Sequence, residues 1–89
     1  MKIKYEKAFL RDIQKVHNEE VKKALKELIS LTKRASCPQE IPKLKKLKGT
    51  QKYYRVRIKR YRLGLKIEKD TVIFVRFLSR KEIYKYFPK

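Results

Sequence analysis

The sequence predicts a single small α+β domain over residues 1–89, with an N-terminal strand, a helical hairpin, a three-stranded antiparallel meander and a short C-terminal helix. Three observations predict this class. The chain has only 89 residues, which leaves room for one hydrophobic core. Its apolar residues, 42% of the chain, recur at helical spacing in the first half and alternate with basic residues in the second. Only two glycines and three prolines interrupt these patterns, so we do not expect a disordered chain.

The first forty residues are expected to form one strand and two helices. Residues 1–5 alternate, with Ile3 between two lysines, which is typical of a strand at the edge of a sheet. Residues 6–16 place apolar side chains at helical spacing. Asn18 is a candidate N-cap for a second helix that ends near Arg34, and two glutamates follow it where the helix dipole favours acids. The apolar stripes of both helices are expected to cover one face of a sheet.

The rest of the chain is expected to form that sheet. It begins with a loop and the basic segment 43–49, which contains two leucines. Three runs of alternating or mainly apolar residues are expected to be strands, at 54–59, 61–68 and 71–78. The short turns between them indicate an antiparallel meander, and a short helix or turn is expected over 80–86.

Side-chain alternation divides the predicted sheet into an apolar face and a basic face. The side chains expected to face the helices are Val56, Ile58, Leu63, Leu65, Ile67, Ile73, Val75 and Phe77. Those expected on the opposite face are Arg55, Arg57, Lys59, Arg62, Lys66 and Arg76, with Arg80 at the end of the last strand. Gly64 lies among them and leaves room for a ligand close to the sheet. Tyrosines that offer rings for stacking are Tyr53, Tyr61, Tyr84 and Tyr86.

The charge of the chain indicates a polyanionic partner. Lysine and arginine number 27 against 9 acidic residues, for a net charge of +18. Residues 41–89 carry 17 basic and 3 acidic side chains, against 10 and 6 in residues 1–40. Such a field attracts nucleic acid, the ribosome, an acidic protein or an anionic membrane, and composition leaves these open. Arginine binds phosphate through its planar fork and stacks on bases, so the predicted face suits exposed RNA or a phosphoryl-transfer transition state.

Residue usage excludes several classes of function. Cys37 and His17 are the only cysteine and histidine, which excludes an internal disulfide, a zinc site built on these residues and catalysis by a histidine pair. We therefore expect no metal and no cofactor, and a lone cysteine suits a reducing cytoplasm. No apolar run reaches the length of about 18 residues that a transmembrane helix needs, and the charged first residues do not form a signal peptide.

The order of elements and three short motifs resemble one known family. The motifs are Leu47-Lys48-Gly49, the pair Tyr54-Arg55-Val56-Arg57-Ile58 and Tyr61-Arg62-Leu63, and the ending Ser79-Arg80-Lys81-Glu82-Ile83-Tyr84. Over nearly its whole length the chain resembles the RelE/ParE superfamily of bacterial and archaeal toxins from toxin–antitoxin pairs. Ser79 stands where many members carry histidine.

The resemblance implies a ribosome-dependent endoribonuclease that cleaves mRNA in the ribosomal A site and so inhibits translation. The RNA's own 2′-OH attacks the adjacent phosphate, without a metal. Arg62 matches the arginine that holds the scissile phosphate, and Arg80 matches the one proposed to assist the leaving group. Tyr84 matches the tyrosine that orients a substrate base. The catalytic residues expected are Arg57, Arg62, Arg80 and Tyr84. The RNA-binding residues expected around them are Arg55, Lys59, Lys66, Arg76, Lys81 and Lys48.

The sequence departs from the family at the two basic strand positions, Arg55 and Arg57. Both are lysines in the best-known member, where one is the proposed general base. Arginine is a poor base at neutral pH because its pKa lies above about 12. Arg57 still neutralises an oxyanion, so proton removal falls to another group, such as Tyr86 or ribosomal RNA. The chemistry is then expected to be more electrostatic than acid–base.

The resemblance and the charge together imply an acidic, RelB-like antitoxin as partner, besides mRNA and the ribosome. We expect it to cover the basic face or to displace the C-terminal helix, with a monomeric free toxin and a higher oligomer in the complex. Two alternatives stay open. One is a ParE-type inhibitor of DNA gyrase with the same fold. The other is a non-catalytic RNA-binding module, which would bind RNA with a steep salt dependence and leave it intact.

Overall fold

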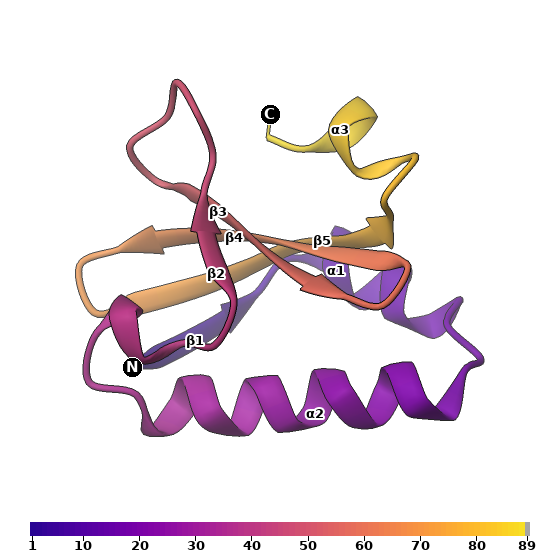
Figure 1. The fold of residues 1–89 in the computed structure, drawn as a ribbon, viewed down its shortest axis with the longest axis horizontal. Coiled ribbons are helices and arrows are strands. Elements are labelled where there is room, and N and C mark those ends of the chain that lie inside the picture. Colours follow the sequence, from indigo (N-terminus) through magenta and orange to yellow (C-terminus); the bar gives the residue numbers. More distant parts are fainter. Residues whose placement is uncertain (89) are drawn as a thin grey trace.

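A five-stranded mixed sheet forms the middle layer of the structure, a computed structural model that describes residues 1–88 (Figure 1). Its strands run in the order β1-β5-β4-β3-β2, with β1 parallel to β5 and the other pairs antiparallel. The strands are β1 (Lys2–Tyr5), β2 (Leu44–Lys46), β3 (Tyr53–Ile58), β4 (Tyr61–Glu68) and β5 (Thr71–Ser79). The helices are α1 (Lys7–Gln14), α2 (Glu19–Arg34), the short 3₁₀ helix η1 (Pro38–Glu40) and α3 (Ile83–Tyr86). The predicted α+β class and the predicted order of elements are confirmed.

The strand β2 adds a fourth antiparallel strand to the predicted three-stranded meander. It lies within the basic segment 43–49, where Leu44 pairs with Val56 and Lys46 pairs with Tyr54 of β3. A run of three residues is too short for alternation to indicate a strand. Its formation therefore depends on pairing with β3, which the local sequence does not reveal.

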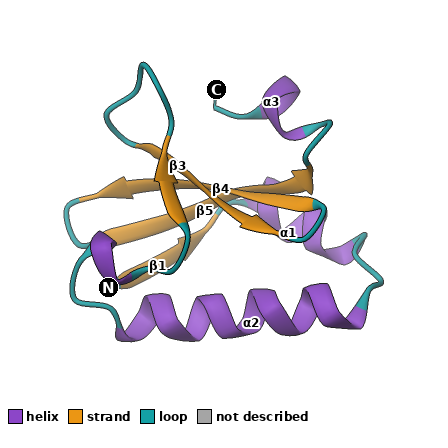
Figure 2. Ribbon diagram, in the orientation of Figure 1, coloured by secondary structure: helices purple, strands orange, loops and turns teal. Residues whose placement is uncertain are grey.

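The two longer helices cover the apolar face of the sheet. In Figures 1 and 2, α2 runs along the lower side of the sheet, and α1 lies behind it, against β5. Asn18 is the predicted N-cap of α2, and its side-chain oxygen accepts a hydrogen bond from the main-chain N–H of Val21 at 3.1 Å. Among residues 1–88 no helix is long and apolar enough to cross a membrane.

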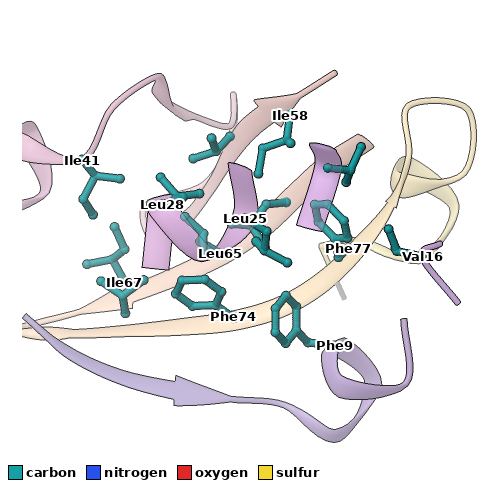
Figure 3. Packing of buried hydrophobic residues seen from close by; sticks show 14 of the residues in the cluster. Phe9, Val16, Leu25, Leu28, Ile41, Ile58, Leu65, Ile67, Phe74 and Phe77 are labelled. Atoms are coloured by element: carbon teal, nitrogen blue, oxygen red, sulfur yellow. The ribbon is translucent and has the colours of Figure 1, made fainter. Parts of the chain in front are cut away.

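The core lies between these helices and the sheet (Figure 3). Phe9 of α1 meets Phe74 of β5 edge to face, with ring centroids 5.4 Å apart. Leu25 and Leu28 of α2 point toward the same cluster. The predicted inward residues of β3 and β4 are all buried, including Val56 and Leu63. The fold thereby fixes the opposite face of β3 and β4 as the one that carries the arginines.

A bulge in β5 changes which of its residues face the helices. Leu65 pairs with Phe74, whereas Gly64 pairs with Arg76, so Val75 is an extra residue in this strand. Phe74 and Phe77 are buried in the core. The prediction that Ile73 and Val75 face the helices is wrong, because strict alternation does not survive a bulge, whereas the inward position of Phe77 is confirmed.

The short helix α3 covers part of the face opposite the core, above the sheet in Figure 1. Ile83 is fully buried, and the ring of Phe87 rests directly over Gly64. Phe87 also meets Tyr53 edge to face, with centroids 5.5 Å apart. The absence of a side chain at Gly64 therefore accommodates an aromatic ring of this chain, at the place where the sequence suggested room for a ligand.

The substitution Gly64→Ala is expected to destabilise the fold by about 1–3 kcal/mol, because it overpacks the contact with Phe87. A Cβ atom at this position lies 2.8 Å from the ring, closer than carbon atoms approach. The free energy of unfolding, measured by urea denaturation, checks this.

The matched control is the double variant Gly64→Ala with Phe87→Ala. Removal of the ring relieves the clash, so the double variant should lose less stability than the sum of the two single changes. Additive losses would show that the two residues do not press on each other.

Candidate anion-binding site

A buried guanidinium forms the centre of the candidate site. Arg62 of β4 is only 8% exposed. Its Nη1 atom donates hydrogen bonds to the main-chain carbonyl oxygens of Lys59, at 3.0 Å, and Tyr61, at 2.9 Å. Among residues 1–88 no carboxylate forms an ion pair with it. The side chain is therefore held firmly in place, but within the described part of the chain its charge has no acidic partner.

Other arginines surround this buried charge. Arg57 lies directly opposite Arg62 across the β3–β4 ladder, and Arg55 lies opposite Gly64 on the same face. Burial lowers the pKa of Arg62 most, and the charges of Arg57, Arg55 and Arg80 lower it further. The cluster therefore disfavours its own charged state, and a bound anion would relieve both the repulsion and the missing pairing.

Two hollows open on this arginine cluster. One, of about 640 Å³, lies at the end of the β3–β4 hairpin. It is lined by Arg57, Lys59, Arg60, Arg62, Ser79, Arg80 and Lys81. The other, of about 780 Å³, extends from Arg62 toward the edge strand β2. It is lined by Lys43, Leu44, Lys45, Arg55, Arg57, Lys59 and Arg62. Both hollows are large enough for more than one phosphate group, and neither has an acidic side chain in its lining.

The turn of the β3–β4 hairpin and the end of β5 position the first hollow. Lys59 adopts a left-handed backbone conformation, with φ of 53°, in the two-residue turn. The main-chain N–H of Arg80 donates to the carbonyl oxygen of Arg60 at 2.9 Å, which ties the end of β5 to this turn. Arg80 at the end of β5 thereby shares one hollow with Arg57 and Arg62 of the hairpin.

Tyr84 lies on α3 beside this cluster. It is 55% exposed, and the charge of its ionised phenol acts to raise the pKa of Arg62, against the effects of burial and of the arginines. An exposed aromatic ring next to a cluster of guanidinium groups is suited to stacking on a base. The structure thus brings Arg57, Arg62 and Arg80 into one hollow, whereas Tyr84 interacts with Arg62 but lines neither hollow.

The other residues predicted to bind RNA are placed unequally. Arg55 and Lys81 line the hollows, and so does Lys59, although its Nζ atom also pairs with Glu20 of α2 at 3.0 Å. Lys66 is on the arginine face but pairs with Glu68 at 3.2 Å, and this hydrogen bond raises the pKa of Lys66. Lys48 is exposed in the β2–β3 loop and lines neither hollow.

Arg76 lies on the predicted basic face, opposite Gly64, but its guanidinium is already engaged within the chain. It forms a two-pronged ion pair with Asp12 of α1, with Nε to Oδ2 at 2.8 Å and Nη2 to Oδ1 at 3.0 Å. Tyr61, predicted to be free for stacking, instead packs against Phe77 with ring centroids 4.9 Å apart. Both differences follow from contacts made across the edge or the inner face of the sheet.

Sequence reasoning did not single out three residues that line the hollows. Arg60 lies in the hairpin turn, and Lys43 and Lys45 lie in and beside β2. The only signal for the lysines is their alternation with Leu44, and it becomes meaningful only once that segment is known to pair with β3. Among residues 1–88 no group of three histidine, cysteine, aspartate or glutamate side chains is placed to hold a metal ion.

Fold and site together define a class: a small α+β domain with an uncompensated arginine cluster on the open face of its sheet. Residues 3–84 match the family model for the ParE toxin of the type II toxin–antitoxin system parDE. The chain is 37% identical over 89 residues to Toxin RelE3 of Methanocaldococcus jannaschii, which covers 99% of this chain and the whole of that relative.

Solved structures agree with these matches. The RelB–RelE antitoxin–toxin complex of Methanococcus jannaschii contains a chain that is 37% identical, with a TM-score of 0.80 over 96% of this chain and 99% of that one. YafQ of E. coli is similar in fold, with 20% identity and a TM-score of 0.71 over 92% of this chain and 96% of that one. The chain belongs to the RelE/ParE family and is a RelE-family toxin of a type II toxin–antitoxin system.

An anion that binds the arginine cluster is expected to stabilise the folded chain. At ten times its dissociation constant, sulfate should add about 1.4 kcal/mol to the free energy of unfolding, because it binds the folded state alone. The midpoint of thermal unfolding, measured over a sulfate titration at constant ionic strength, checks this. The variant Arg62→Gln should lose most of the gain.

The control separates binding from the general stabilisation that sulfate gives to proteins. Lys26→Gln changes one charge on the exposed side of α2 and should keep the full gain. Equal gains in the parent chain and in Arg62→Gln would place the anion elsewhere.

Proposed function

We propose that this toxin is a metal-independent endoribonuclease that cleaves mRNA in the ribosomal A site and so stops translation. The single observation that carries the proposal is the buried, unpaired guanidinium of Arg62 among Arg55, Arg57 and Arg80. A phosphodiester gains negative charge on its oxygens as the 2′-OH attacks, and fixed cations around it stabilise that charge most strongly where water is excluded.

Each arginine has a distinct part in this proposal. Arg62 holds a non-bridging oxygen of the scissile phosphate, because its side chain is fixed by two carbonyl hydrogen bonds. Arg57, exposed on the neighbouring strand, neutralises the attacking oxygen. Arg80, which lines the same hollow as Arg57 and Arg62, stabilises the leaving 5′ oxygen. Tyr84 stacks on a base next to the cut and orients the 2′-OH toward the phosphate.

The general base is not among the arginines. All of the charged groups that line the two hollows are cations, so within residues 1–88 neither a carboxylate nor an imidazole lines them. The rate acceleration by this chain then comes from positioning and charge stabilisation. The group that removes the proton arrives with the substrate. Ribosomal RNA can supply this proton acceptor, which supports a cleavage reaction that depends on the ribosome.

An acidic antitoxin is proposed as the natural inhibitor. The relative from Methanococcus jannaschii was crystallised as a complex with RelB. In this chain the same role calls for acidic side chains that reach Arg62, Arg57 and Arg80, since none of these arginines has an acidic partner within residues 1–88. A partner segment that pairs with them would both mask the charge and occupy the hollows.

Inhibition of DNA gyrase is the second candidate function. The observation that favours it is the match of residues 3–84 to the family model for ParE. The arginine cluster favours RNA cleavage over it, because binding to gyrase does not require a buried cation prepared for a phosphate. A supercoiling assay with purified gyrase separates the two.

Primer extension on an mRNA in a translating extract tests the proposed activity. With the purified protein added, new 5′ ends should appear in register with codons, and only when ribosomes are present. Ends in a parallel reaction without ribosomes would show a free ribonuclease instead. If neither reaction gives new ends, the proposed cleavage is wrong. The gyrase assay and an RNA-binding assay then distinguish a gyrase inhibitor from a non-catalytic RNA-binding module.

The variants Arg62→Ala and Arg80→Ala are each expected to lower the cleavage rate by about 10²–10³-fold, because each removes a charge aimed at the phosphate in the transition state. Single-turnover cleavage on programmed ribosomes measures the rate. The matched control Lys26→Ala removes a cation from the far side of α2 and should keep the parent rate. Unchanged rates in both arginine variants would contradict the site assignment.

A further inference from the structure

A buried carboxylate accepts a main-chain hydrogen bond from the part of β5 that does not pair with β1. The pairing of β1 with β5 ends at Tyr5 and Phe74, and the chain then turns into α1. Three residues further along β5, the main-chain N–H of Phe77 donates to Oδ2 of Asp12 at 2.9 Å. Asp12 is only 5% exposed, so this side chain takes the place that a neighbouring strand would occupy.

The same carboxylate holds Arg76 in a fixed direction. Both carboxylate oxygens accept hydrogen bonds from the guanidinium, at 2.8 and 3.0 Å, and this pairing raises the pKa of Arg76. The Arg76 side chain is 22% exposed, so a large part of it is withdrawn from solvent. A planar guanidinium gripped at two nitrogens by a nearly buried partner has little freedom to rotate.

The other side of that guanidinium meets α3. Its central carbon lies 5.1 Å from the centroid of the Tyr86 ring, within the range of a cation–π interaction. Arg76 therefore connects α1, on the core side of the sheet, with α3, on the arginine side. In the strand register Arg76 lies opposite Gly64, the residue on which Phe87 rests, so two contacts fix α3 near one point of the sheet.

The placement of α3 also decides the placement of Tyr84. The helix spans only Ile83–Tyr86, and a helix of four residues has little stability of its own. Its position depends on what it touches. A shift of Tyr86 away from Arg76 would carry Tyr84, two residues earlier, away from Arg62.

We propose that Arg76 is a positioning residue: clamped by Asp12, it holds α3 against the sheet and so keeps Tyr84 beside Arg62. We do not expect it to bind RNA itself, because Asp12 already neutralises its charge and occupies the edge formed by Nε and Nη2. The contribution to cleavage rests on the proposed function, whereas the contribution to the position of α3 does not.

The first test measures the position of α3 without any substrate. In Arg76→Lys the charge remains but the planar fork is lost, so the main-chain amides of Lys85 and Phe87 should exchange with solvent about 3- to 30-fold faster. Amides in the middle of α2 should be unchanged, which separates a local release from general unfolding. The control Arg11→Gln changes an exposed arginine next to Asp12 and should leave α3 as in the parent. Equal exchange rates in Arg76→Lys and the parent would overturn the proposal.

The second test asks whether Arg76 acts through Tyr84. Arg76→Lys should lower the single-turnover cleavage rate in the parent background, and should have little further effect in Tyr84→Ala, because both changes remove the same contribution. Equal losses in both backgrounds would show that Arg76 does not act through Tyr84.

A salt titration separates positioning from direct RNA contact. In Arg76→Gln the dependence of RNA affinity on salt should stay as in the parent. A slope smaller by about 0.7 would mean that Arg76 releases a counterion by contacting a phosphate, and would overturn the proposal. If the parent chain does not cleave mRNA, the proposed function fails, while amide exchange still decides whether Arg76 holds α3.

Discussion

The burial of the Arg62 charge, with no carboxylate partner among residues 1–88, is the constraint around which the open face of the sheet is arranged. Main-chain carbonyls supply its hydrogen bonds, so the guanidinium is fixed without being neutralised. An uncompensated cation beside other cations costs folding free energy, which the core on the other face must offset. Such an arrangement is understandable where the missing anion belongs to a ligand, because the same unpaired charge that weakens the free protein strengthens the complex.

The two faces of the sheet have different roles, one in stability and one at the candidate site. The face under α1 and α2 supplies the apolar burial, with Phe9, Leu25 and Phe74 among its central contacts. The other face carries the cations and is only partly covered, by α3. The ion pair between Asp12 and Arg76 links the two faces at the edge of β5. The position of α1 therefore affects Arg76 and, through it, α3 beside the candidate site.

Sequence patterns with a local cause predicted most of this structure. Period-two alternation placed the arginines of β3 and β4 on one face, and the preference of asparagine for helix starts placed the beginning of α2. What sequence could not predict depends on partners distant in the chain. The bulge at Val75 breaks the alternation that β5 was expected to follow, β2 exists only through β3, and Asp12 meets a residue 64 positions away. For that reason the arginines at 57, 62, 76 and 80 were assigned to the correct face, whereas the pairing of Arg76 with Asp12 was not predicted.

The parallel pairing of β1 with β5 also bears on when the protein becomes folded. Lys2 lies opposite Thr71, so β1, the first strand in the chain, cannot form its hydrogen bonds until β5, the last strand, has been made. Contacts of such long sequence separation slow folding, since the intervening chain must be ordered first. The end of β5 and α3, which complete the surroundings of Arg62, are made later still. The arginine face is therefore completed only after β5 and α3 have been made, whereas the helices α1 and α2 are available much earlier.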